Sequence, residues 1–117
     1  MTQPPEDQKA QDRSPTPEAP DPAKVDAKTR LSAGLLQGQM PGGWSGDVKG
    51  IWREWTFDEY LDGVQFAERV AQQADAVNHH PDLLIRYRRV RVSYTTHDAG
   101  GVTAMDVSEA ASLDDLR

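Results

Sequence analysis

The three histidines of the chain lie in two short polar segments. His79 and His80 are adjacent and precede Pro81, whereas His97 lies between Thr96 and Asp98. Histidine is the side chain whose unperturbed pKa lets it give and take a proton near neutral pH. General acid–base catalysis needs such groups, so both segments are candidates for proton-transfer chemistry. The alternative is that all three are solvated loop residues.

A long helix is expected directly before the histidine pair, over residues 57–77. Thr56 and Glu59 form a capping-box pattern at its start. Pro81 disfavours helical conformation in the residue before it, so the pair is expected on a turn that could direct both rings at one cavity. Apolar residues at three- and four-residue intervals predict one buried helix face. Its members are Phe57, Tyr60, Leu61, Val64, Ala67, Val70, Ala71, Ala74 and Val77.

The remaining pattern predicts two hairpins and two further helices. Strands are expected over 44–48 and 51–55 and over 83–87 and 89–96, with turns at 49–50 and 87–89. A first helix is expected over 27–40, and Thr103 is expected to cap a last one. The order α-β-β-α-β-β-α predicts an α+β domain with a four-stranded antiparallel sheet and helices packed on one face.

Composition divides the chain into a tail and one folding unit. Residues 1–26 hold six of the eight prolines and no aromatic residue, which predicts a disordered acidic tail. The predicted domain is residues 27–117. A domain this small has a modest core, so self-association into a homodimer or homotetramer is expected.

The net charge of −6 argues against a nucleic-acid-binding protein. Four arginines cluster near one predicted hairpin, where they favour the solvent face of a strand, with anion binding as the minor alternative. They are Arg86, Arg88, Arg89 and Arg91. The chain has no cysteine and no apolar run of signal-peptide or membrane-spanning type, so a cytoplasmic protein is expected.

The spacing of the chemical residues resembles the signature of the pterin-4a-carbinolamine dehydratase family. That spacing joins Asp75, the pair His79-His80, Tyr87, His97 and Asp106. The Pro-Gly-Gly-Trp stretch ending at Trp44 looks like the family's opening turn with one extra glycine, and residues 96–103 look like its closing loop. The resemblance covers residues 29–117. Leu83 stands where many members have tryptophan, and Val102 where leucine is usual.

The resemblance implies loss of water from a 4a-hydroxytetrahydropterin to give a quinonoid dihydropterin, in tetrahydrobiopterin recycling. His79 and His97 would be the proton-transfer pair, and His80 would bind the pterin or share the acid role. Asp75, Asp106 and Trp44 would bind substrate, although Asp106 could also cap a helix or hold a histidine tautomer, and Trp44 could be core. The reaction needs no cofactor or metal. A pterin-dependent aromatic amino acid hydroxylase would be the functional partner.

Two other functions compete with this interpretation. A zinc site could use the histidines and an aspartate, but adjacent histidines rarely bind one ion together and no cysteine supports them. A non-enzymatic assembly or interaction protein could also be built on the same scaffold, with the tail as a tether.

Overall fold

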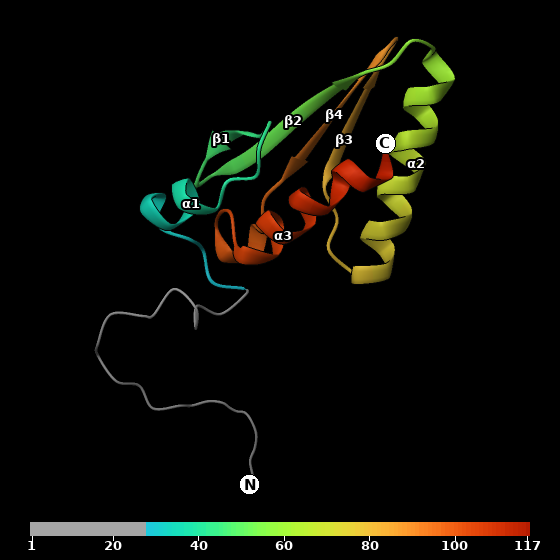
Figure 1. Ribbon diagram of the computed structural model, residues 1–117. Coiled ribbons are helices and arrows are strands. Elements are labelled where there is room, and N and C mark those ends of the chain that lie inside the picture. Colours follow the sequence, from blue (N-terminus) through green and yellow to red (C-terminus); the bar gives the residue numbers. More distant parts are fainter. Residues whose placement is uncertain (1–27) are drawn as a thin grey trace, which may run out of the picture.

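A computed structural model describes residues 28–117 (Figure 1). The tail predicted for residues 1–26 lies outside the described residues. The described part contains three α-helices, four strands and two short 3-10 helices. These are α1 (Ala33–Gln39), β1 (Ser45–Asp47), β2 (Gly50–Thr56), α2 (Tyr60–Val77), β3 (Asp82–Arg86), β4 (Arg89–Tyr94), η2 (His97–Ala99), α3 (Ala104–Ser112) and η3 (Leu113–Leu116).

The four strands form one antiparallel sheet in the order β1-β2-β4-β3, as the sequence predicted. The two hairpins join through β2 and β4, where Ile51 pairs with Tyr94 at one end and Thr56 with Arg89 at the other. Figure 1 shows α2 and α3 on the same side of this sheet. The α+β fold predicted from the order of elements is therefore confirmed.

The core lies between the sheet and these helices. Alternate residues of the two central strands are buried, including Ile51, Trp55 and Val92, because successive side chains of a strand point to opposite faces. Phe66 of α2 packs on Trp55, with ring centroids 4.9 Å apart. Trp44 packs edge-on against Trp55 at 5.8 Å and completes the aromatic centre.

Both predicted starts of the first two helices are wrong. Helix α1 begins at Ala33 and not at 27, because the Ser32 hydroxyl accepts a hydrogen bond from the Leu35 N–H at 3.2 Å and caps it. Helix α2 begins at Tyr60, and its N-cap Glu59 makes no side-chain capping bond. Thr56 cannot form the predicted capping box because it is still the last residue of β2.

The predicted buried face of α2 is also partly wrong. Tyr60, Leu61 and Val77 are 48%, 63% and 44% exposed, and Ala71 is exposed as well. Ala67, Val70 and Ala74 are buried as predicted, and Gly63 and Phe66, which the prediction did not include, are buried beside them. The buried face of α2 therefore includes Gly63 and Phe66 and excludes Tyr60 and Leu61.

Candidate active site

The turn at the end of α2 buries one of the two adjacent histidines and exposes the other. Asn78 takes the left-handed conformation with φ 55°, and the His79 N–H donates to the Ala74 carbonyl at 3.1 Å. This cap turns the chain sharply after Val77, and Pro81 then leads into β3. As a result His79 is 9% exposed, whereas the His80 side chain is 56% exposed.

His79 is held by a buried carboxylate from α3. Its Nε2 lies 2.6 Å from Oδ1 of Asp106, which has no exposed surface. An ionised carboxylate can only accept, so Nε2 carries the proton and Nδ1 is the ring atom free for chemistry. The imidazole is thus fixed in both tautomer and orientation.

The second oxygen of Asp106 is occupied as well. Its Oδ2 accepts from the Thr103 backbone N–H at 2.8 Å and from the Thr96 hydroxyl at 2.7 Å. The Thr103 contact is half of a capping box, in which Thr103 and Asp106 bond each other's backbone at the start of α3. This confirms the structural role predicted for Asp106, and one residue both caps the helix and holds His79.

His80 also forms a pair with an aspartate, but this pair is exposed to solvent. Its Nε2 lies 2.8 Å from Oδ1 of Asp75, one helical turn earlier on α2. The Asp75 side chain is 82% exposed. Water and ions screen such a pair, so it holds the ring less firmly than Asp106 holds His79.

All three histidines border one hollow of ≈ 300 Å³. Its lining residues are Asn78, His79, His80, Thr95, Thr96, His97 and Asp98. A second hollow of ≈ 320 Å³ shares Asn78, His79, Thr96 and Asp98 with it and extends toward Lys28 and Met105. His97 opens η2, and its side chain makes no hydrogen bond or ion pair within residues 28–117. Two turns far apart in the sequence therefore meet around one concave surface.

Tyr94 supports the His79 ring from the core side. The two rings are stacked, with centroids 5.9 Å apart and planes 5° from parallel. Burial raises the pKa of Tyr94 far above its ordinary value, and the negative charges of Glu109 and Asp106 raise it further. Tyr94 thus presents a neutral, protonated phenol to the ring.

Trp44, predicted to bind substrate, lies in the core. It is 7% exposed, its ring is 5.9 Å from that of Tyr94, and it is absent from the lining of both histidine hollows. Its contact with a ligand stays a prediction.

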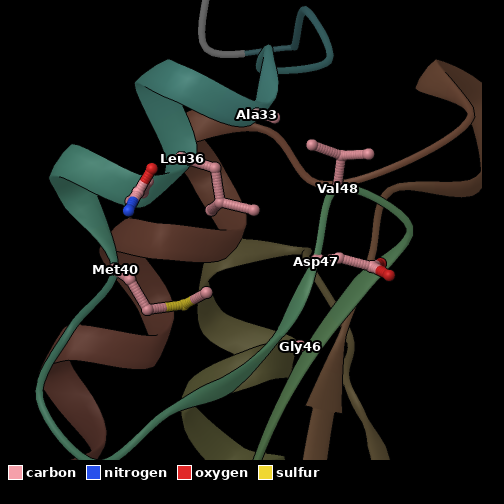
Figure 2. Close-up of a pocket in the computed structure, with 7 residues that line it drawn as sticks. Ala33, Leu36, Met40, Gly46, Asp47 and Val48 are labelled. Atoms are coloured by element: carbon pink, nitrogen blue, oxygen red, sulfur yellow. The ribbon is translucent and has the colours of Figure 1, made fainter.

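A larger hollow of ≈ 400 Å³ lies between α1 and the β1–β2 turn (Figure 2). Leu36, Met40 and Val48 give it a mostly apolar wall, and Figure 2 shows their side chains converging on it. It contains no histidine and one carboxylate, that of Asp47, which already accepts from the Lys49 N–H at 2.8 Å. We therefore place the candidate site at the histidines.

Two features of the described residues bear on other functions. Within residues 28–117, no three histidine, cysteine or acidic side chains are grouped so that they could hold a metal ion. No helix in this part of the chain is long and apolar enough to cross a membrane.

Comparison with known proteins identifies the family. The sequence model of the family described as pterin 4 alpha carbinolamine dehydratase matches residues 25–116. The chain belongs to this family. The resemblance seen in the histidine and aspartate spacing is thereby confirmed.

Individual relatives agree with this assignment. A Halobacterium salinarum protein, provisionally named pterin-4-alpha-carbinolamine dehydratase, is 46% identical over 88 residues, which are 75% of this chain and 97% of that protein. A Paracoccus denitrificans protein with the same provisional name is 46% identical over 94 residues, covering 77% of this chain and 88% of its own length.

Two solved structures share the fold. A transcriptional coactivator/pterin dehydratase from Brucella melitensis superposes with a TM-score of 0.71 at 26% identity, over 75% of this chain and 98% of that one. A pterin dehydratase-like protein described as a RuBisCO assembly factor of the alpha-carboxysome gives 0.51 at 18% identity, over 62% and 84%.

The sequence did not point to several residues of the site. Thr96 contacts Asp106, Asn78 shapes the turn, and Tyr94 stacks on His79. Asn78 could have been found, because an asparagine directly after a helix is a common left-handed cap. Thr96 and Tyr94 carry no such local signal, since their contacts depend on the packing of the sheet end against α3.

Proposed function

We propose that the chain is a 4a-hydroxytetrahydropterin dehydratase that works by histidine general acid–base catalysis. The observation that carries the proposal is the His79–Asp106 pair, buried beside a hollow that His80 and His97 also line. A carboxylate in this position stabilises the imidazolium that forms when the ring takes up a proton. The family membership supports the pterin as the substrate.

The reaction needs one proton donated and one accepted. As the C4a–O bond breaks, the hydroxyl leaves with its electron pair and receives a proton, giving water. The adjacent ring nitrogen loses its proton, and the freed electron pair forms the C=N bond of the quinonoid product. His79, through Nδ1, suits the base because Asp106 stabilises its charged form. The acid is then one of the two more exposed rings, His97 before His80.

The remaining site residues take supporting roles in this proposal. Asp75 orients His80, and the fully buried Asp106 acts through His79. We also propose that the protein is cytoplasmic, forms a homodimer or homotetramer, and serves tetrahydrobiopterin recycling beside a pterin-dependent aromatic amino acid hydroxylase.

The decisive test is an assay of dehydration with variants of the proposed pair. Purified protein should accelerate the decay of the 4a-hydroxypterin absorbance without added metal or nucleotide. His79→Ala and His97→Ala should each lower kcat by roughly 100- to 10,000-fold while circular dichroism stays unchanged. Wild-type rates in both variants would overturn the site assignment, and activity lost on dialysis against a chelator would favour the zinc alternative.

A second candidate is a role in assembly or interaction with other proteins. The Brucella melitensis relative is named as a coactivator as well as a pterin dehydratase, and this chain exposes large apolar side chains on α2 and the β3–β4 hairpin. A pull-down comparing the full chain with residues 28–117 tests whether the first residues act as a tether. An identical set of partners would reject that role for them.

A further inference from the structure

A hollow lined by three arginines lies at the opposite end of the sheet from the histidines. It has a volume of ≈ 320 Å³, and its lining residues are Thr56, Phe57, Arg86, Tyr87, Arg88 and Arg89. The histidines precede β3 and follow β4, whereas this hollow lies at the hairpin that joins the two strands. The five residues of β3 separate the two places by roughly 15 Å, at about 3.3 Å per residue.

Four guanidinium groups gather at this hollow. Besides the three arginines that line it, Arg117 donates from Nη2 to the Thr56 carbonyl at 2.7 Å and lies 5.1 Å above the Phe57 ring. Arg88 similarly donates from Nε to the Phe57 carbonyl at 3.3 Å. Bonds to backbone carbonyls position these two side chains without neutralising their charge.

Few carboxylates compensate these charges. Arg89 lies 3.7 Å from Glu54, which also lies 3.9 Å from Arg91 on the open face of the sheet. The Arg86 side chain has no ion pair or hydrogen bond within residues 28–117. Asp58 and Glu59 follow Phe57 in the chain, but the lining of the hollow includes neither of them and no other carboxylate. A local excess of positive charge therefore exists on a chain whose net charge is −6.

We propose that this hollow binds a small ligand with a multivalent phosphate group. The planar, multi-donor guanidinium matches phosphate oxygens, and several of them around one concave surface can share a diphosphate. Tyr87 is 72% exposed, its ring stacks on Tyr60 at 6.5 Å, and the Arg88 guanidinium carbon lies 5.8 Å from the ring centroid. A heteroaromatic ring attached to the phosphate would meet this aromatic and cationic group beside the hollow. The ligand class is therefore an inorganic diphosphate or a nucleoside phosphate.

Calorimetric titration of the full chain with pyrophosphate and with a nucleoside diphosphate tests the proposal. The wild type should bind pyrophosphate saturably, and binding should weaken as salt rises from about 0.05 M to about 0.5 M, because exposed charges are screened. Arg86→Gln should weaken binding by about fivefold, and the Arg86→Gln/Arg88→Gln pair by more than about tenfold. Arg86 has no partner to lose, so the single variant should fold normally.

Lys49→Gln is the matched control, because it removes one positive charge at the β1–β2 turn, far from the hollow. It should change binding by less than about twofold. Tyr87→Ala separates the ligand sources: a selective loss of nucleotide binding identifies a stacked ring, whereas an equal effect on both ligands identifies the phosphate group alone. Wild-type binding in Arg86→Gln/Arg88→Gln, no saturable binding by the wild type, or equal binding of duplex DNA would overturn the proposal. None of these outcomes depends on dehydratase activity.

Discussion

His79 differs from the other two histidines in how firmly it is held. Its ring is enclosed between Tyr94 and Asp106, and Asp106 is itself bonded on both oxygens. The His80 ring has only an exposed partner, and the His97 ring has no hydrogen-bond or ion-pair partner within residues 28–117. A general base that must take up a proton in one geometry benefits from a fixed ring. A general acid that protonates the departing hydroxyl can tolerate a more mobile ring.

Asp106→Asn tests whether this carboxylate serves catalysis as well as the fold. An asparagine keeps the shape, but it removes the charge that stabilises a protonated His79, so kcat should fall by roughly 100-fold or more. A capping loss of about 0.5–2 kcal/mol in unfolding free energy is expected in addition. Steady-state kinetics together with urea denaturation separate the two effects.

Asp75→Asn is the control for that experiment, because it changes the exposed histidine–aspartate pair in the same way. Its kcat should fall by less than about tenfold, since a solvated pair contributes little. Equal losses in the two variants would mean that burial of Asp106 has no special role. Wild-type kcat in Asp106→Asn would show that Asp106 acts only as a helix cap.

At the scale of elements, sequence patterns correctly predicted the turns and helix ends that depend on neighbouring residues. Both hairpins, the end of α2 at Val77 and the Thr103 cap of α3 follow from neighbouring residues, and all are present. Thr56 was assigned to the wrong element because a capping pattern and a strand end look alike when the strand's partner is unknown. Thr56 belongs to the strand because it pairs with Arg89, 33 positions later in the chain.

The same limit applies to the site. The sequence placed three histidines on two turns, but it could not say that His79 turns inward and His80 outward. That difference arises from the left-handed Asn78 and from α3, which brings Asp106 beneath His79. The spacing of the residues identified the histidine set, and the tertiary contacts show which of the adjacent rings is buried.

The close approach of α2 to the sheet depends on the lack of a side chain at Gly63. A Cβ at this residue would meet a Phe57 ring carbon and Cγ2 of Val90, both at 3.2 Å. Gly63→Val should therefore push α2 from the sheet and lower the unfolding free energy by about 1–3 kcal/mol. Gly34→Val on α1, where nothing lies within 4 Å, should stay within about 0.5 kcal/mol. Urea denaturation measures both, and equal stabilities would contradict the close approach.

At the scale of the whole molecule, the described surface leaves two apolar regions uncovered. Leu61 and Tyr60 lie at the start of α2, and Ile85 and Leu84 lie on β3, which pairs with β4 on one side only. An open strand edge and an exposed apolar stripe are both features that a second copy can cover. These surfaces support the expected self-association.

Leu61→Glu and Ile85→Glu separate the two surfaces in sedimentation velocity over a range of concentrations. If copies pack through α2, the Leu61 variant should sediment as a smaller species, because a buried unpaired carboxylate strongly opposes the contact. If copies pair through β3, the Ile85 variant should sediment as the smaller species.

A tetramer built on both surfaces would become a dimer in either variant, since closed assemblies use each surface once per copy. Gln39→Glu on α1 adds the same charge elsewhere and should change nothing. An unchanged sedimentation coefficient in both α2 and β3 variants would show that neither surface is an interface.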